Sequence, residues 1–144
     1  MTVSIRRAAL CDSRALGAVF EAAFAAYQKA GLKIPPVGDG VEHDIRHHAV
    51  WAAEDNGVIE GGLVLSVDGA QAHLVLVAVS PSAGGKGIGT ALIDTAVLFA
   101  RENGVKEIRL ATHRRLTQNV SLYQRLGWRK SGTEGDKVLM VRNI

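Results

Sequence analysis

The chain has 144 residues, of which 47% are hydrophobic and 22% are charged, and its formal net charge is +3 at pH 7. The hydrophobic content excludes a disordered chain, and the length suits one globular domain, so we expect residues 1–144 to fold as a single domain. The small positive charge fits an anionic ligand, whereas the scattered basic residues do not indicate a nucleic-acid partner.

Targeting and redox features of the sequence are few. No apolar run approaches the ~20 residues that span a membrane, and no apolar signal segment follows Arg6 and Arg7. Cys11 is the single cysteine, which excludes an internal disulfide framework. We therefore expect a cytoplasmic protein with no membrane partner.

The first half of the chain alternates between strand and helix patterns. Apolar and polar residues alternate near the N-terminus, and apolar residues then recur at helical spacing behind a candidate cap, Asp12 or Ser13. A Pro-Pro pair at 35–36 predicts an irregular loop, and an Asn-Gly turn at 56–57 predicts a β-hairpin. The elements expected in this half are strands over 2–9, 50–54, 58–67 and 71–79 and helices over 14–30 and 41–48.

The stretch 75–101 carries the strongest local pattern. An apolar strand ends at Val79, Pro81 breaks it, a glycine-rich loop follows, and a helical pattern runs from Thr90 to about Asn103. Glycines let backbone N–H groups approach a ligand, and a helix start offers unpaired N–H groups, so this loop is a candidate phosphate site. Its spacing fits neither a P-loop nor a dinucleotide fingerprint. The alternative role for the glycines is a tight turn with close helix–strand packing.

The remaining elements follow from glycines and apolar runs. Gly104 ends the helix of the central stretch, and Gly127 ends a later one at a helix C-cap. We expect a strand over 107–112, a helix over 117–126, and final strands supplied by Trp128 and by 138–142.

The glycine loop and its flanks resemble motif A of the GNAT superfamily of N-acetyltransferases. In that family the pattern Q/R-x-x-G-x-G/A follows a strand and opens a helix, and the loop holds the pyrophosphate of acetyl-CoA. Gly87 and Gly89 match the two glycines, while Gly84 stands where the family usually has Gln or Arg, which removes one side chain and leaves the backbone donors. The resemblance implies that acetyl-CoA is the co-substrate. The loop residues that it implies as cofactor-binding are Gly84, Gly85, Lys86, Gly87, Ile88, Gly89 and Thr90.

The order of elements resembles the GNAT fold over nearly the whole chain. This resemblance implies an α/β (α+β) fold with a mixed, mostly antiparallel central sheet, flanked by helices, in which strands four and five run parallel and splay apart. In the family the pantetheine arm of the cofactor pairs with the fourth strand. The backbone groups of Val77 and Val79 are therefore expected to bind it.

The segment 112–128, THRRLTQNVSLYQRLGW, resembles motif B of the same family. There the tyrosine lies near the sulfur of the cofactor and acts as general acid, a role that falls to Tyr123; the alternative is a core tyrosine whose hydroxyl bonds to the backbone. Asn119 matches a residue that binds cofactor or caps the helix. Ribosomal-protein N-terminal acetyltransferases have Asn seven residues before the tyrosine, and Leu116 at that place argues against their substrate.

Direct acetyl transfer requires a neutral amine, and the general base is left open. The fourth strand carries no acidic residue, so His73, Glu54, Glu21 and a water molecule are the candidates. Each of these side chains could also be an ordinary surface group.

Other reactive residues favour no further chemistry. His43, His47 and His48 are placed on a helix, with i, i+4 spacing between the first two, but we interpret them as a solvated helix face and expect no metal. Cys11 lacks a local histidine partner and is not expected to act as a nucleophile.

The sequence therefore indicates an acetyl-CoA-dependent N-acetyltransferase that acts by direct attack of a primary amine on the acetyl group. The expected partner is an amine on a small molecule or a peptide, and a homodimer is left open. The alternative is a non-catalytic acetyl-CoA or CoA-binding sensor or interaction module. Tyr123 favours the enzyme, and the absence of an acid on the fourth strand keeps the alternative open.

Overall fold

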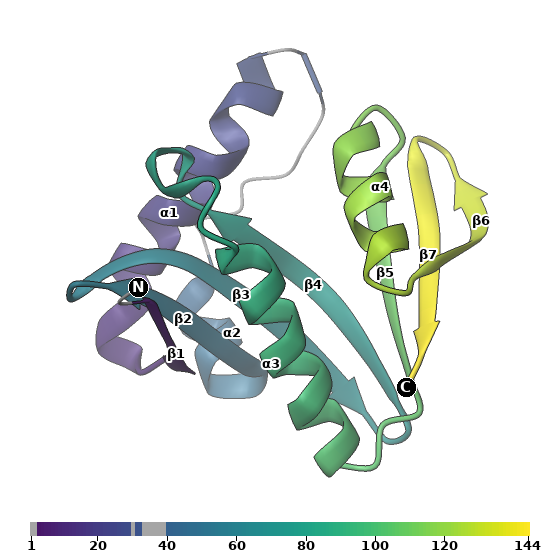
Figure 1. Ribbon diagram of the computed structural model, residues 1–144, viewed down its shortest axis with the longest axis horizontal. Helices are drawn as coiled ribbons and strands as arrows, with labels where there is room; N and C mark the ends of the chain where they lie inside the picture. The colour runs from purple at the N-terminus through teal and green to yellow at the C-terminus, as the bar shows by residue number, and fades with distance from the viewer. Residues whose placement is uncertain (1–2, 30, 33–39) are drawn as a thin grey trace. The chain divides into compact units, whose positions relative to one another are not determined.

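The computed structural model describes residues 3–29, 31–32 and 40–144 (Figure 1). The chain forms two compact units, Met1–Leu65 with Leu76–Ala96 and Ser66–Val75 with Val97–Ile144. The expected Pro-Pro loop lies outside the described residues. The expectation of a single domain stays a prediction.

Seven strands form the sheet in the order β1-β2-β3-β4-β5-β7-β6. The registers of β1 with β2, β2 with β3, β5 with β7 and β6 with β7 are antiparallel, while β4 and β5 pair in parallel. The predicted mixed, mostly antiparallel sheet is confirmed. The strands are β1 (Val3–Arg7), β2 (Ala49–Asp55), β3 (Val58–Asp68), β4 (Gln71–Val79), β5 (Glu107–His113), β6 (Arg129–Glu134) and β7 (Lys137–Asn143).

Four α-helices and two short 3-10 helices complete the described chain. None of the helices in the described ranges is long and apolar enough to cross a membrane. The α-helices are α1 (Ser13–Lys29), α2 (Val41–His47), α3 (Ile88–Glu102) and α4 (Thr117–Arg125), and the 3-10 helices are η1 (Leu10–Asp12) and η2 (Pro81–Ala83).

Two adjacent glycines of β3 let helices pack closely on both faces of the first unit. Successive residues of a strand point to opposite faces. A Cβ at Gly62 would lie 2.6 Å from the Leu16 side chain of α1, and a Cβ at Gly61 would lie 2.9 Å from the Ile88 side chain of α3. A side chain at either position would therefore displace buried atoms of these helices. Figure 1 shows α2 and α3 on opposite faces of the strands of the first unit.

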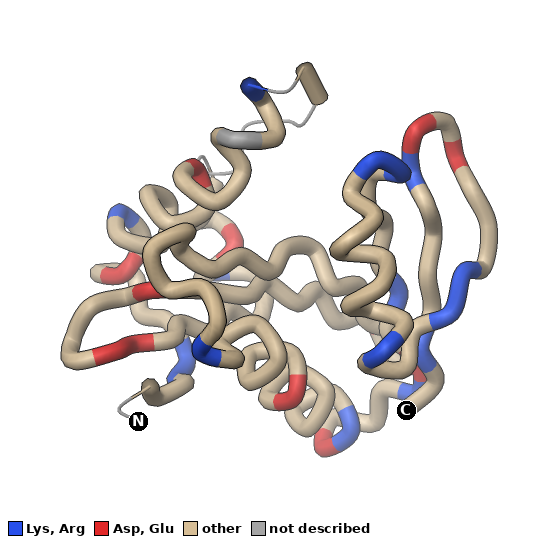
Figure 2. Tube along the Cα trace, turned by 45° about the horizontal axis from the view of Figure 1, so that its top comes forward, with Lys and Arg blue, Asp and Glu red and all other residues tan. Residues whose placement is uncertain are grey.

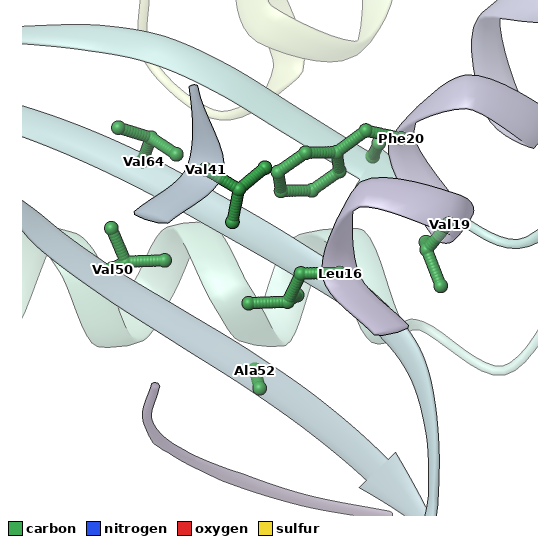
Figure 3. Close-up of a cluster of buried hydrophobic side chains, with 8 residues drawn as sticks. Leu16, Val19, Phe20, Val41, Val50, Ala52 and Val64 are labelled. Carbon is green, nitrogen blue, oxygen red and sulfur yellow. The ribbon is translucent and has the colours of Figure 1, made fainter. Parts of the chain in front are cut away.

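One core cluster of the first unit lies between the sheet and helices α1 and α2 (Figure 3). The apolar stripe of α1 faces the strands, as its helical spacing predicts. Fully burying one such aliphatic or aromatic side chain contributes about 1.5–3 kcal/mol. The buried members of this cluster are Leu16, Val19, Phe20, Val41, Val50, Ala52, Val64 and Ala78.

The second unit is built on β5 and β7. β5 pairs with the start of β4 from Gln71↔Glu107 to His73↔Arg109, and with β7 along its whole length. The indole N–H of Trp128 donates to the carbonyl oxygen of Ile108 at 3.0 Å in a buried position. This bond ties the chain after α4 to β5, as expected for a core tryptophan.

The strand boundaries differ from expectation at the end of the chain. β6 begins at Arg129, so Trp128 lies just before the strand and not in it. All residues of β6 are exposed, which explains why no alternation of apolar residues indicates this strand. Its lysine and arginine suit an edge strand, because charged edges resist pairing with other chains.

The N-terminal cap of α1 also differs from expectation. The carboxylate of buried Asp12 accepts the backbone N–H of Ala9 at 2.7 Å, and the Ser13 hydroxyl donates to the Leu10 carbonyl at 2.6 Å. Both side chains thus belong to the preceding 3-10 turn. Arg6 explains the difference, because its guanidinium binds both oxygens of Asp12, at 2.7 and 2.9 Å, and draws the carboxylate toward β1.

Arg6 joins three elements of the first unit. Besides Asp12 of η1, its guanidinium donates to the carboxylate of Glu54 on β2, with Nε at 2.8 Å from Oε1. Hydrogen bonds from Arg6, and the Ala9 N–H, outweigh burial and hold the pKa of Asp12 below its ordinary value of 3.8. The charged carboxylate of Asp12 is therefore more stable in the folded chain than in the unfolded chain.

Substitution of Asp12 by asparagine should therefore give a pH-dependent loss of stability. Because the folded pKa lies below the unfolded one, the contribution of the carboxylate is complete well above pH 4 and is lost as pH falls through the folded pKa. We expect Asp12→Asn to lower the free energy of unfolding by about 1–2 kcal/mol at pH 7, less than a fully buried pair because Arg6 is partly exposed. The difference should shrink between pH 4 and pH 2 in urea titrations.

The control is Asp94→Asn on the exposed side of α3, which removes one carboxylate without touching Arg6. A pH-independent difference between wild type and Asp12→Asn would contradict the ion-pair explanation.

Candidate active site

The glycine loop of the first unit is fixed at both ends. Before it, the Ser80 N–H donates to the carbonyl oxygen of Glu60 at 2.7 Å. Glu60 is the extra residue where the register of β3 with β2 shifts, a bulge that redirects the strand. Ala83 and Ile88, each only 2% exposed, bury the two ends of the loop. The residues between them are all exposed.

The backbone of the loop has the conformation that glycine permits. Gly85 and Gly87 have φ values of +83° and +72°, in the left-handed region, and open space surrounds the Cβ position of each. Gly89 differs, because it lies inside α3 and its Cβ would make an ordinary contact of 3.7 Å with Val79. The left-handed backbone thus explains why glycine occupies positions 85 and 87, whereas glycine at position 89 suits the packing of α3 on β4.

The start of α3 offers backbone donors beside this loop. The Ala91 N–H bonds to the Gly87 carbonyl at 3.0 Å, the first bond of the helical ladder. The N–H groups of Ile88, Gly89 and Thr90 precede that bond, so they lack carbonyl partners within the helix. With the positive end of the helix dipole behind them and no side chains on the flanking glycines, these donors fit a pyrophosphate group.

Lys86, between the two left-handed glycines, is the cation of the loop. Its ammonium group lies 2.7 Å from the Asp55 carboxylate at the end of β2. Hydrogen bonding to Asp55 raises the pKa of Lys86, so the ammonium is charged at neutral pH. Acidic residues gather on this hairpin, at Glu54, Asp55 and Glu60 (Figure 2). Sequence reasoning found Lys86 and missed Asp55, because the pair spans 31 positions of the chain.

Val77 and Val79 occupy the last part of β4, directly before the loop. Both side chains are half-buried. Strand β4 therefore carries these two residues directly into the glycine loop, on one continuous segment of the first unit. Their expected pairing with a pantetheine arm stays a prediction.

Tyr123 is held by the C-terminal cap of α4 in the second unit. The Trp128 N–H bonds to the Tyr123 carbonyl at 2.9 Å, and the Gly127 N–H bonds to the Gln124 carbonyl at 3.2 Å. This pair of bonds is a Schellman motif, with Gly127 at φ +103° as its left-handed residue. The predicted helix C-cap at Gly127 is confirmed.

The Tyr123 ring is 8% exposed and meets the Trp128 ring edge-on, with centroids 5.9 Å apart. The Arg142 guanidinium lies over the Trp128 ring, at 5.3 Å from its centroid. Most charged positions of α4, β6 and β7 are basic (Figure 2). Tyr123 is thus rigidly placed in the second unit by its backbone cap and by its ring contact.

Asn119 lies in the first turn of α4, and Leu116 takes the N-cap position. The Asn119 N–H bonds to the Leu116 carbonyl at 3.0 Å. Asn119 is therefore the third helical residue, and the helix-cap reading of its side chain is wrong. Its role in cofactor binding stays a prediction.

The candidate bases differ in their surroundings. The Glu54 carboxylate forms an ion pair with Arg6, and this contact links β2 to β1 in the first unit. Glu21 is exposed on α1. His73 lies in the part of β4 that pairs with β5, where loss of hydration and the charge of Lys137 lower its pKa. Its imidazole is therefore neutral at pH 7 and able to accept a proton.

The histidines of α2 lie close together. The rings of His43 and His47 have centroids 4.3 Å apart, and the ring of His48 lies 6.3 Å from that of His43. Among the residues that the structure describes, no group of three His, Cys, Asp or Glu side chains is placed to hold a metal ion. Cys11 is exposed in η1.

Comparison with known proteins gives matches at the level of sequence and of fold. The chain is 31% identical over 93 residues to rat N-acetyltransferase family 8 member 2, an alignment that covers 60% of this chain and 41% of the rat protein. It is 30% identical over 92 residues to the probable N-acetyltransferase family 8 member 5 of mouse, with 60% and 40% covered. The chain thus spans about two fifths of the length of these curated relatives.

Solved structures share the fold at low sequence identity. The PaiA N-acetyltransferase of Thermoplasma acidophilum, in complex with coenzyme A, has a TM-score of 0.91 and 20% identity over 100% of both chains. The ribosomal-protein-S18-alanine N-acetyltransferase of Escherichia coli has a TM-score of 0.83 and 18% identity, with 99% of this chain and 94% of that chain covered.

One family model matches most of the chain. The model of the acetyltransferase (GNAT) family covers residues 17–128, from the second turn of α1 through the glycine loop to the cap of α4. Acetyl-CoA is the acetyl donor of this family. The chain therefore belongs to the GNAT family of acetyltransferases.

Proposed function

We propose that the chain is an N-acetyltransferase that transfers the acetyl group of acetyl-CoA to a primary amine on a small molecule or a peptide. The observation that supports the proposal is the continuous segment from β4 into α3, where two left-handed glycines adjoin the N–H groups of the first turn of a helix. Such an arrangement suits an anionic ligand. Acetyl-CoA supplies the acetyl group. The loop from Gly84 to Thr90 would bind its pyrophosphate, and Val77 and Val79 would bond its pantetheine arm.

The proposed chemistry is direct transfer. The amine nitrogen forms a bond to the acetyl carbonyl carbon while the carbon–sulfur bond breaks, and Tyr123 gives its hydroxyl proton to the leaving sulfur. The amine nitrogen loses a proton to a base. A thiolate is a better leaving group when a donor is in place, because a thiol has a pKa of roughly 8.5.

The base remains open among His73, Glu21, Glu54 and water. Glu54 is the weaker candidate, since Arg6 holds its carboxylate in an ion pair. The acceptor is equally open. Leu116 at the start of α4 still argues against the ribosomal-protein substrate.

Acetyl-CoA should stabilise the folded chain, and amines should then release free thiol. A ligand that binds only the folded state at 100 times its Kd adds about 2.7 kcal/mol of stability, so the melting temperature should rise by several degrees. The measurement is a thermal melt with acetyl-CoA, with NAD and ATP as controls. A panel of polyamines, aminoglycosides, amino acids and peptides with thiol detection then identifies the acceptor.

The two parts of the test separate the enzyme from the binding module. Stabilisation by acetyl-CoA without thiol release from any amine would favour the non-catalytic sensor. Absence of stabilisation at saturating acetyl-CoA would overturn both readings.

A further inference from the structure

The exposed part of the glycine loop has one side chain with which to hold its shape. Between the buried residues Ala83 and Ile88 lie Gly84, Gly85, Lys86 and Gly87. Three of these four residues have no side chain, and glycine loses more conformational freedom on ordering than any other residue. Lys86 is therefore the one residue of this segment that can fasten it through a side chain.

Asp55, the ion-pair partner of Lys86, occupies a well-supported position in the sheet. Asp55 ends β2, its side chain is only 15% exposed, and its carboxylate accepts the Lys86 ammonium at 2.7 Å. β2 is paired on both sides, with β1 and with β3, so Asp55 sits at the end of a supported strand. The ion pair links the middle of the loop to the sheet.

We propose that Asp55 is a positioning residue for cofactor binding: through its ion pair with Lys86 it holds the glycine loop in the conformation that receives the phosphates. This inference rests on the proposed function. A tether of this kind lowers the ordering cost of a ligand that the loop must surround, which raises affinity by pre-organisation. The Lys86 backbone lies between the left-handed residues Gly85 and Gly87, so fixing its side chain limits the freedom of both turns.

The expected size of the effect follows from the exposure of the pair. Lys86 is 44% exposed, and exposed ion pairs contribute little, so loss of the tether should weaken CoA binding by about two- to fivefold. Both Asp55→Ala and Lys86→Met should show this loss. The double variant should be no weaker than either single variant, because both remove the same interaction.

Further measurements test whether the ion pair acts as a tether. Pantetheine lacks the phosphates, so its affinity should be the same for all variants. The exchanged pair Asp55→Lys with Lys86→Asp restores an ion pair of reversed polarity and should recover most of the CoA affinity. In steady-state assays of Asp55→Ala the KM for acetyl-CoA should rise while kcat stays unchanged.

The test combines calorimetry with amide hydrogen exchange of the free protein. The amides of 84–90 should exchange about two- to fivefold faster in Asp55→Ala and in Lys86→Met. The matched control is Arg46→Met, which removes an exposed ion pair with Glu42 on α2 and should change neither loop exchange nor CoA affinity.

The competing role for Lys86 is direct contact with a phosphate. In that case Asp55→Ala would tighten CoA binding or leave it unchanged, and the exchanged pair would lose affinity, which would overturn the proposal. Unchanged loop exchange in both single variants would overturn it as well. A wild-type chain that binds no CoA would overturn the proposed function itself, while the exchange measurement would still decide whether the tether exists.

Discussion

Replacing Tyr123 by phenylalanine should lower the single-turnover rate of acetyl transfer by about 10²–10⁴-fold, the range for loss of a general acid. The affinity for acetyl-CoA should change little, because the proton is donated mainly in the transition state. Rate and affinity are measured on the same variant, by rapid quench and by calorimetry, with an amine from the panel.

Phenylalanine at position 123 would remove the hydroxyl and keep the packing of the ring. The ring of Tyr123 packs edge-on against Trp128, and its backbone carbonyl caps α4, and both contacts are kept by phenylalanine. If the hydroxyl has only a structural role, the cost is one hydrogen bond, roughly 1 kcal/mol of unfolding free energy, and turnover stays near that of the wild type. A lowered melting temperature with unchanged turnover would therefore refute the general-acid role.

The matched control is the other tyrosine of the chain. Tyr27 lies on α1, with its ring 5.8 Å from that of Phe24. Tyr27→Phe removes one hydroxyl from the same protein outside motif B, and it should leave the transfer rate within about twofold of wild type, well outside the general-acid range.

Replacing Gly87 by valine should abolish the stabilisation by acetyl-CoA. Gly87 has φ +72°, and a left-handed conformation costs a residue with a Cβ roughly 1–2 kcal/mol, with more for a β-branched residue. The Cβ position faces open space, which is where the proposed phosphate would lie, so the side chain would also block the ligand. Thermal melts with and without acetyl-CoA give the result.

Two glycine controls separate strain from binding. Gly69→Val places valine at φ +62° in the turn after β3 and should cost stability without loss of acetyl-CoA binding. Gly132 lies on exposed β6, has no positive φ, and has open space around its Cβ position. Gly132→Val should therefore lower neither the stability nor the affinity for acetyl-CoA. If Gly87→Val binds acetyl-CoA like the wild type, the loop is not the phosphate site.

The sequence predicted what is encoded locally. β4 has the predicted bounds, because its apolar run and the proline after it lie next to each other in the chain. The glycine loop was recognised for the same reason, although α3 begins at Ile88 and not at Thr90. The helix can start two residues early because Ile88 packs against Gly61 of β3, a contact that local pattern does not contain.

Residues whose roles depend on distant partners could not be assigned in this way. Glu54 is a candidate base by its sequence position, and its ion pair with Arg6, 48 positions away, forms only in the folded chain. The same arginine draws Asp12 from the helix cap. Strand β6 lacked an apolar signal because all its residues are exposed. For Glu54 and Asp12 the deciding contact is made by Arg6 of β1, which only the folded chain brings to both carboxylates.

The adjacent glycines of β3 also bear on how the first unit folds. Glycine is among the poorest strand formers, since it gives up the most backbone freedom and offers no side chain to a neighbour. Gly61 and Gly62 therefore make the middle of β3 weak on its own, and its order depends on α1 and α3 docking from either side. Helices and strand thus become ordered together. An opening of either helix should release the strand and, with it, the bulge at Glu60 that holds the entrance of the glycine loop.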